Sequence, residues 1–93
     1  PIRPGGEVSA EGEWMLFPNP SQGLFYLDWR NQQVEEGDEL WVVNATGQSM
    51  KKLKMTGDRD HFTLDLRTMP VGVYRIFLKQ ATQVSVKEII IYR

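Results

Sequence analysis

The sequence predicts an all-β domain, and three observations lead to this prediction. Apolar and polar residues alternate in short runs, as side chains do along a strand with one buried and one solvated face. Turn-forming residues separate these runs at intervals of roughly 8–12 residues, which is typical of a β-sandwich or a barrel. No segment has the apolar periodicity of a helix. We therefore expect short antiparallel strands and no helix.

Seven strands are expected, one for each run. They cover residues 13–17, 24–29, 39–45, 48–55, 61–66, 73–79 and 83–92. Side chains two positions apart share a face of a strand, and this places a common set in the core: Phe25, Leu27, Trp29, Leu40, Val42, Phe62, Leu64 and Leu66. The last run ends in three isoleucines without alternation. We expect a strand that is covered on both faces, or one that a partner covers.

Length and composition limit the classes of function. The chain has 93 residues, enough for one domain, and its net charge of −1 gives no long-range field that would attract nucleic acid or an anionic membrane. It has no cysteine, which excludes disulfides and a thiol nucleophile. No apolar run reaches the roughly 18 residues that a membrane span needs, so no membrane insertion is expected.

The start of the chain differs from the rest. Residues 1–12 are rich in Pro, Gly and Glu and have no periodic apolar pattern, so we predict a linker there and a folded domain over residues 13–93. The chain begins with Pro1 rather than Met, which indicates a piece of a longer protein. Any signal peptide would then lie upstream.

Residues 17–23 (Phe-Pro-Asn-Pro-Ser-Gln-Gly) form the most constrained segment of the chain. Pro18 and Pro20 fix φ, lack an N–H donor and keep the residue before each of them out of the helical region. Gly23 is free to adopt a positive φ where the next strand begins. We therefore expect a rigid, shaped connection between two strands.

Residues 66–74 (Leu-Arg-Thr-Met-Pro-Val-Gly-Val-Tyr) are the second constrained segment. Pro70 and Gly72 turn the chain just before Tyr74. This order resembles the tyrosine corner of β-sandwiches, in which the phenol hydroxyl bonds to the backbone a few residues upstream, and we predict that bond for Tyr74. Another turn, at residues 45–48, has a glycine between two strands and predicts a tight hairpin.

Few residues suggest catalysis, and we predict no enzyme, metal site or cofactor. His61, the single histidine, stands at the start of an alternating strand and is expected to be exposed. The carboxylates of residues 35–39 would suit calcium, but their spacing matches no EF-hand and a solvated loop is the simpler interpretation. Lys51, Lys52 and Lys54 lack interleaved aromatics, which favours protection of a sheet edge over nucleic-acid binding.

Four short elements follow one another along the chain. The first is an aromatic-Pro-Asn-Pro sequence followed by glycine: Phe17, Pro18, Asn19, Pro20 and Gly23. The second is an apolar run that ends at an amide residue and is followed by glycine: residues 40–47, with Gly47. The third has proline, glycine and tyrosine at alternate positions after Met69: Pro70, Gly72 and Tyr74. The fourth is a lysine and a β-branched run: Lys87, Ile89, Ile90 and Ile91.

Together these elements resemble the C-terminal sorting domain of the bacterial type IX, or Por, secretion system, in the variety called type A. Phe17 stands where the family more often has tyrosine, and Met69 where it has leucine. The resemblance implies a seven-stranded Ig-like sandwich that acts as a secretion signal for a larger, Bacteroidetes-type exported protein. The residues of the four elements are then the signal motif.

The resemblance also implies partners and a route. In the family, the passenger folds in the periplasm, and the sorting domain directs it through the outer-membrane translocon to the cell surface or the medium. A sortase commonly removes the domain, and we expect the cut within residues 1–13, because a protease binds exposed, unpaired chain. An unpaired terminal strand would be recognised by β-augmentation, so residues 87–93 are expected to be needed for export although the passenger folds without them. The alternative is that this strand is part of the core and that its loss unfolds the signal.

An accessory module of an extracellular enzyme is the alternative function. Such a module would share the Ig-like or fibronectin-like fold. Trp14, Trp29, Trp41 and Tyr26 could form an aromatic platform for sugars, and alternation places Trp41 and Tyr26 on the face opposite to their core neighbours. Trp29 instead falls in the core register.

Overall fold

The computed structural model describes residues 14–29, 34–57 and 60–93, so the predicted linker and cleavage region lie outside the described residues. The described chain forms seven strands: β1 (Met15–Phe17), β2 (Leu24–Asp28), β3 (Glu39–Asn44), β4 (Ser49–Lys54), β5 (His61–Asp65), β6 (Gly72–Lys79) and β7 (Val84–Ile91). Each strand falls on a predicted run, with ends that differ by at most two residues. The described residues contain no helix that could span a membrane.

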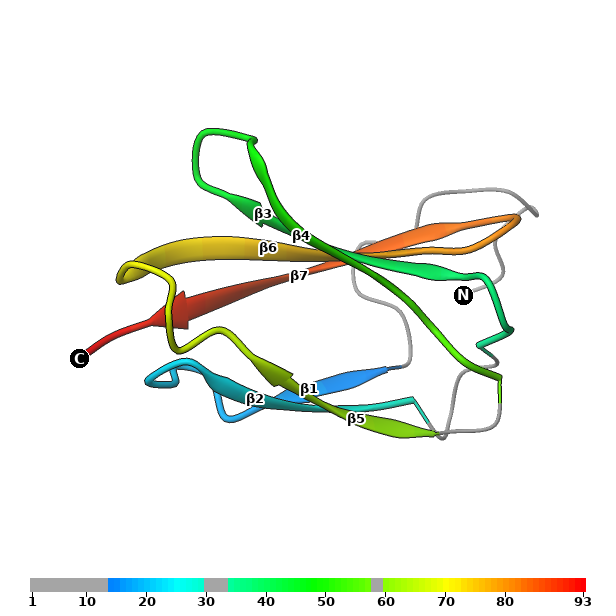
Figure 1. The fold of residues 1–93 in the computed structure, drawn as a ribbon, viewed down its shortest axis with the longest axis horizontal. Helices are drawn as coiled ribbons and strands as arrows, with labels where there is room; N and C mark the ends of the chain where they lie inside the picture. Colours follow the sequence, from blue (N-terminus) through cyan, green and yellow to red (C-terminus); the bar gives the residue numbers. More distant parts are fainter. Residues whose placement is uncertain (1–13, 30–33, 58–59) are drawn as a thin grey trace, which may run out of the picture.

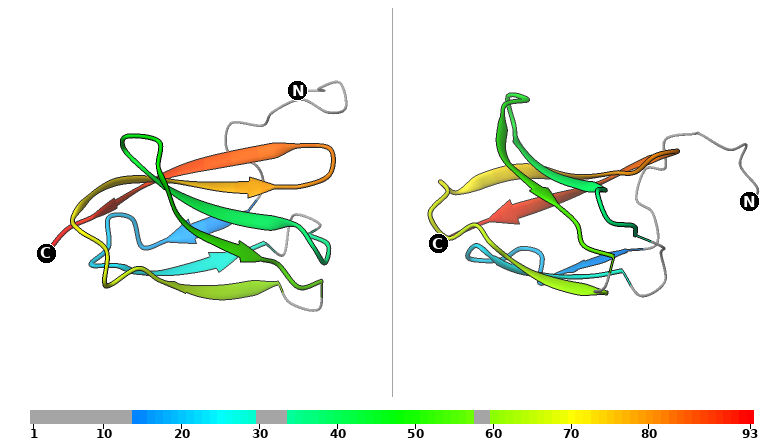
Figure 2. Two further views of the ribbon diagram at one scale, coloured as in Figure 1. Left: turned by 45° about the horizontal axis from the view of Figure 1, so that its top comes forward. Right: turned by 45° about the vertical axis from the view of Figure 1, so that its right-hand side comes forward.

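The strands form two antiparallel sheets, which lie one above the other in Figure 1. One sheet has the order β1-β2-β5 and the other the order β4-β3-β6-β7. Figure 2 shows the same two layers from further directions. The predicted fold class, all-β with seven strands in two antiparallel sheets, is confirmed and is compatible with a β-sandwich. The Ig-like assignment stays a prediction: β4 pairs with β3, whereas constant-type immunoglobulin domains place their fourth strand in the sheet of the first.

The core lies between the sheets and contains all but one of the predicted side chains. Those that are buried as predicted are Phe25, Leu27, Trp29, Leu40, Val42, Leu64 and Leu66. Phe62 packs against the core but is only partly buried, because β5 is an edge strand and this side chain lines a hollow of about 260 Å³ beside Trp29 and Leu53. Burial of this apolar surface is the main driving force for folding.

One polar contact lies inside this apolar core. Trp14, 1% exposed, donates a hydrogen bond from Nε1 to Oγ of Ser85 at 2.8 Å, and Ser85 is fully buried. Trp14 precedes β1 and Ser85 lies in β7, so the bond joins the edges of the two sheets. The indole N–H and the hydroxyl satisfy each other away from water.

The register brings distant segments to one end of the molecule. Gly72 at the start of β6 is opposite Ile91 at the end of β7, and Tyr74 is opposite Asn44 at the end of β3. The β1–β2 connection reaches the same end, shown at the left of Figure 1 beside the C-terminus. We call this the motif end. β1 begins at the other end of the sandwich, because Met15 pairs with Asp28, the last residue of β2.

Candidate recognition site

The β1–β2 connection lies against the outer edge of β7, the last strand of the four-stranded sheet. Asn19 Nδ2 donates to the Glu88 carbonyl at 2.9 Å, and Asn19 Oδ1 accepts from the Ile90 N–H at 3.0 Å. The peptide bonds before Pro18 and Pro20 are both cis. The predicted rigid connection is therefore fixed to the terminal strand through the asparagine between its two prolines.

Ser21 extends this contact with its main chain. Its N–H donates to the Ile90 carbonyl and its carbonyl accepts from the Tyr92 N–H, both at 3.0 Å, which makes an isolated parallel bridge to Ile91. The Ser21 side chain is buried, and its Oγ donates to the Leu24 carbonyl at 2.7 Å and accepts from the Gly23 N–H at 3.1 Å. One serine thus bonds both to the start of β2 and to the end of β7.

Side chains of the terminal strand β7 alternate between buried and exposed, although this alternation cannot be recognised in its three consecutive isoleucines. Ile89 and Ile91 are buried at 0% and 2% exposure, whereas Ile90 between them is 42% exposed on the outer face. The strand pairs with β6 along its whole length, and Asn19 and Ser21 bond to the last part of its outer edge. The expectation that both faces of this strand are covered is wrong, because Ile90 lies on an exposed outer face, whereas the alternative that a partner covers the strand stays a prediction. The strand is also not unpaired, because it pairs with β6 and the distant residues 18–21 cover the last part of its outer edge.

Gly23 lies against the start of the 66–70 turn. Its φ is +127°, as predicted for a glycine here, and a Cβ at this position would lie 2.8 Å from the Arg67 Cα. The Leu66 N–H donates to the Gly23 carbonyl at 2.7 Å. Both the backbone angle and the close approach require glycine.

The predicted tyrosine corner is present. The buried Tyr74 donates its hydroxyl proton to the Pro70 carbonyl at 2.7 Å. The Met69 N–H closes the preceding turn onto the Leu66 carbonyl at 3.0 Å, and Gly72 has a φ of +147° where β6 begins. This turn therefore has a fixed shape beside the C-terminal residues.

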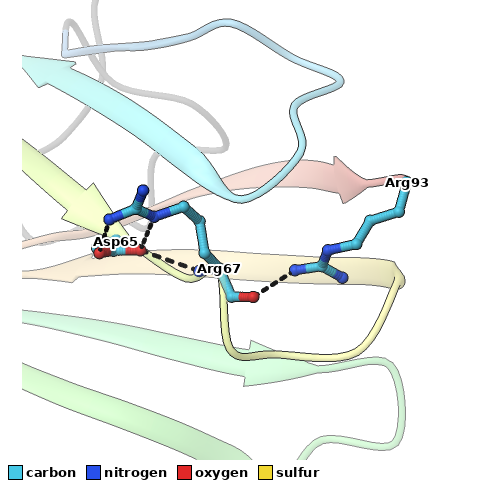
Figure 3. Close-up of polar contacts among 3 residues, drawn as sticks. All are labelled: Asp65, Arg67 and Arg93. Atoms are coloured by element: carbon cyan, nitrogen blue, oxygen red, sulfur yellow. Dashed lines mark hydrogen bonds and ion pairs between the residues drawn. The ribbon is translucent and has the colours of Figure 1, made fainter.

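Arg93 joins the end of the chain to this turn (Figure 3). Its guanidinium donates to the Met69 carbonyl at 3.0 Å and to the Arg67 carbonyl at 2.6 Å. The Arg67 guanidinium in turn makes two hydrogen bonds to the Asp65 carboxylate, at 2.9 and 2.8 Å. The side-chain bonds, together with one from the Arg67 N–H, hold the pKa of Asp65 well below its ordinary value. The side-chain bonds and the charge of Asp65 raise the pKa of Arg67.

The β3–β4 hairpin also lies at the motif end. Asn44 Oδ1 accepts hydrogen bonds from the N–H groups of Thr46 and Gln48, at 3.1 and 2.8 Å, and the Gly47 N–H donates to the Asn44 carbonyl at 3.0 Å. Gly47 has a φ of +92°. The predicted tight turn is confirmed, and the amide residue before it organises the turn through its side chain.

The family model described as "Secretion system C-terminal sorting domain" matches residues 15–92, which include all seven strands. The chain belongs to this family. The resemblance to type IX sorting domains is therefore confirmed, and with it a role as a C-terminal sorting signal that interacts with the type IX secretion machinery for export to the cell surface or beyond. No curated protein matches the chain.

The sorting domain exposes several apolar side chains near its motif end. Val73 and Ile90 are opposite each other on β6 and β7, and they are 40% and 42% exposed. Phe17 and Tyr26, also paired and also exposed, have ring centroids 6.1 Å apart on the other sheet. Tyr92 lines a hollow of about 470 Å³ with Pro18, Pro20 and Tyr26, among other residues.

One predicted signal residue lies apart from the others. Lys87 is in the middle of β7, opposite Ile76, and its Nζ lies 5.2 Å from the centroid of the Trp14 ring. It thus lies beside the first described residue rather than at the motif end. The remaining predicted signal residues lie at the end of β1 (Phe17), in the β1–β2 connection, in the two turns at Gly47 and Pro70, at the start of β6 (Gly72 and Tyr74) and in the final residues of β7.

The other candidate residues of the sorting domain have local contacts. His61 is exposed and its Nδ1 is 2.9 Å from Asp60 Oδ1. Among the described residues, no group of three or more carboxylate or histidine side chains could hold a metal ion. In the carboxylate run, Asp38 Oδ2 accepts from the Glu35 N–H at 2.9 Å and from Gln80 Nε2 at 3.0 Å. The lysines of β4 lie on an edge strand, where the sequence favoured them as edge protection.

The four aromatic residues do not form one platform. Trp14 and Trp29 are buried in the core. Tyr26 faces outward from the three-stranded sheet, whereas Trp41 faces outward from the four-stranded sheet. The Trp41 ring is already covered by Lys52 and Lys79, whose Nζ atoms are 4.0 and 3.4 Å from its centroid. The arrangement therefore gives no support to a sugar-binding surface built from these residues.

Proposed function

We propose that this domain is read at its motif end by the outer-membrane translocon of the type IX machinery, and that it delivers a covalently joined upstream passenger. The observation that carries the proposal is the convergence of the loop, the hairpin, the tyrosine corner and the end of β7 at the end opposite to the start of β1. Because the passenger precedes β1, the machinery approaches the motif end without meeting the passenger.

The exposed apolar residues support recognition at this end. Val73 and Ile90 form an adjacent pair on one outer face, and Tyr92 is 49% exposed next to the proline loop. Partly exposed apolar side chains grouped beside rigid turns are suited to burial against a partner, since little conformational entropy remains to be lost. The translocon would bury this group, and the domain itself would act without catalysis.

The domain would act along an export route that ends with its removal from the passenger. The passenger crosses the inner membrane by its own signal peptide, folds in the periplasm, and is carried through the outer membrane. A sortase then cuts within residues 1–13, and the passenger is released or attached to the cell surface. The cut position is testable by mass spectrometry of the exported passenger: a mature C-terminus beyond Phe17 would exclude it.

Deletion of residues 87–93 is a poor test of recognition, because it removes the buried Ile89 and Ile91 and so destroys the fold. A sharper test fuses the chain to a periplasmic reporter in a bacterium with a working type IX system. Val73→Lys places a charge on the motif end without touching the core. Thr56→Lys is the matched control, since Thr56 is also β-branched and exposed but follows β4 at the end of the sandwich away from the motif end.

The two variants separate recognition from folding. We expect Val73→Lys to reduce export of the reporter about tenfold, the effect of losing about 1.4 kcal/mol of binding, and Thr56→Lys to leave it unchanged. Both should unfold within a few degrees of the unsubstituted chain. Periplasmic retention of the unsubstituted fusion would refute the sorting role for this chain, whereas equal export of all three would refute recognition at the motif end.

A further inference from the structure

The outer edge of β7 is divided into two parts. Ile90 uses both its N–H and its carbonyl for bonds to the β1–β2 loop, so the even-numbered residues of β7 direct their main-chain polar groups away from β6. The same alternation directs the N–H and carbonyl of Val84 and Val86 outward. Within the part of the chain that the structure describes, these groups have no hydrogen-bond partner. The loop therefore covers the second part of the edge and leaves the first part open.

The loop imitates a neighbouring parallel strand. In a parallel ladder, one residue donates to the carbonyl before its partner and accepts from the N–H after it. The Asn19 carboxamide makes these two bonds around Ile89, with the Glu88 carbonyl and the Ile90 N–H, and the Ser21 main chain makes the equivalent pair around Ile91. If this ladder continued toward the start of β7, its next residues would lie beside Lys87 and Ser85. Their hydrogen bonds would go to the carbonyls of Val84 and Val86 and to the N–H groups of Val86 and Glu88.

A groove runs along this open part of the edge. It has a volume of about 570 Å³ and lies between the two edge strands β1 and β7. Its lining residues are Trp14, Met15 and Leu16 on the β1 side, Val86, Lys87 and Glu88 on the β7 side, and also Asn19 and Arg75. The groove therefore offers unpaired main-chain groups beside both apolar and charged side chains, to which an extended peptide could bond through its main chain.

We infer that the outer edge of Val84, Val86 and Glu88 is a strand-addition site for an extended segment of the type IX secretion machinery. The added segment lies between β1 and β7 and stops where Asn19 takes the place of the next strand residue. This inference rests on the proposed function, since it names a second surface by which the same machinery holds the domain. Main-chain bonds provide the affinity, and the pockets of the groove select the alternate side chains.

The opposite edge of the same sheet is protected against such addition. On β4, the pairing with β3 directs the N–H groups of Lys52 and Lys54 outward, and both side chains are exposed lysines. Lysine on an edge strand opposes pairing with another chain because the charge would have to be desolvated. The outward positions of the open part of β7 carry Val84, Val86 and Glu88, so two of these three positions have no charge that strand addition would desolvate. The two edges thus differ in the number of charged side chains that would oppose pairing with an added strand.

Amide hydrogen exchange tests the site directly in the full 93-residue chain. In the free domain, the Val84 and Val86 amides should exchange at least about tenfold faster than the Ser85 amide, which faces β6. Addition of outer-membrane vesicles that contain the secretion machinery should slow the Val86 and Glu88 amides, which the added strand would bond, by about tenfold or more. Vesicles from a strain without the translocon should not. Slow exchange of both valines in the free domain would overturn the inference, because the edge would already be covered.

Proline substitution provides the second test. Val86→Pro removes an outward N–H and blocks the edge, yet keeps the bonds to β6, which belong to the odd-numbered residues. Lys54→Pro makes the same change at an outward position of β4. We expect Val86→Pro to lower reporter export about tenfold, through the loss of one or two main-chain bonds, and Lys54→Pro to leave it unchanged.

The outcomes distinguish this inference from the proposed function. Export of Val86→Pro at the unsubstituted level would refute strand addition while leaving the sorting role intact. Failure of the unsubstituted fusion to be exported would refute the sorting role itself. If Val86→Pro does not fold, the exchange experiment on the unsubstituted chain decides: Val86 and Glu88 amides that the machinery leaves unprotected refute the inference, and protection of both supports it.

Discussion

The side chain of Asn19 occupies the position that a strand would take beside Ile90: its Oδ1 accepts the Ile90 N–H at 3.0 Å across 71 positions of the chain. Its Nδ2 completes the imitation by donating to the Glu88 carbonyl. The loop thereby links the edge of the four-stranded sheet to the sheet that contains β1 and β2. The Pro-Asn-Pro sequence is thus a structural closure of one side of the sandwich.

Removal of the Asn19 carboxamide should weaken this closure. Asn19→Ala loses two hydrogen bonds, each with a net worth of about 0.5–1.5 kcal/mol, so we expect the free energy of unfolding to fall by about 1–3 kcal/mol. Urea denaturation measures the difference. Gln22→Ala, at an exposed position of the same loop, is the control and should change stability by less than about 0.5 kcal/mol. Equal stability of the two variants would contradict the assigned role of Asn19.

Gly23 should tolerate substitution less well than a glycine in an open turn. Gly23→Ala places a Cβ 2.8 Å from the Arg67 Cα and must also keep a φ of +127°. Gly47→Ala is the matched control, because Gly47 has a φ of +92° and its added Cβ would have no neighbour within 4 Å. We expect about 1–2 kcal/mol of destabilisation for Gly47→Ala and at least about 1 kcal/mol more for Gly23→Ala, from thermal unfolding. Similar melting temperatures would show that the close approach relaxes freely.

The strands were predictable because alternation is a local property of the sequence. Phe25 and Leu27 identify the inner face of β2 without knowledge of any other strand. Alternation could not be recognised at Ile89, Ile90 and Ile91, because the three side chains are identical and their order does not indicate which one faces outward. Only the pairing with β6 decides that Ile90 is exposed.

The site was predictable in its rigid parts and not in its long-range contacts. Proline, glycine and tyrosine act on their own neighbourhood, so the loop at Gly23 and the corner at Tyr74 could be located from sequence. The contacts of Ser21 with Ile90 and of Arg93 with the 66–70 turn depend on how two sheets meet. No spacing along the chain encodes them, and a serine in a loop or an arginine after a strand is otherwise an ordinary surface residue.

The buried hydrogen bond between Trp14 and Ser85 should contribute to the stability of the domain. Ser85→Ala leaves the indole N–H of Trp14 without its partner in the core, and such a group costs about 1–3 kcal/mol of stability. Ser49→Ala, at an exposed position of β4, is the control. Denaturant unfolding should separate the two variants by more than about 1 kcal/mol. A difference near zero would mean that another acceptor, such as water, replaces the hydroxyl.

The lowered pKa of Asp65 should make the stability of the domain depend on pH. Its pKa is lowered in the folded state, chiefly by the side-chain hydrogen bonds of Arg67, so the ionised carboxylate favours folding. This contribution is complete above the unfolded pKa of about 3.9, and it is lost as the pH falls through the lower, folded value. The difference in melting temperature between the unsubstituted chain and Asp65→Asn should therefore be constant near neutral pH and should shrink below about pH 4.

The size of this effect should be small, because the two side chains are 49% and 63% exposed and the solvent screens their attraction. Titration of the Asp65 carboxyl by NMR provides the control. Arg67→Ala should raise its pKa toward the ordinary value, but not completely, since the N–H of residue 67 still donates to Oδ1. Salt should reduce the stability difference between the unsubstituted chain and Asp65→Asn at neutral pH. An unchanged Asp65 pKa in Arg67→Ala would show that the guanidinium does not lower the pKa of this carboxyl. The ion pair of Asp65 and Arg67 would then be a surface contact that adds nothing to stability.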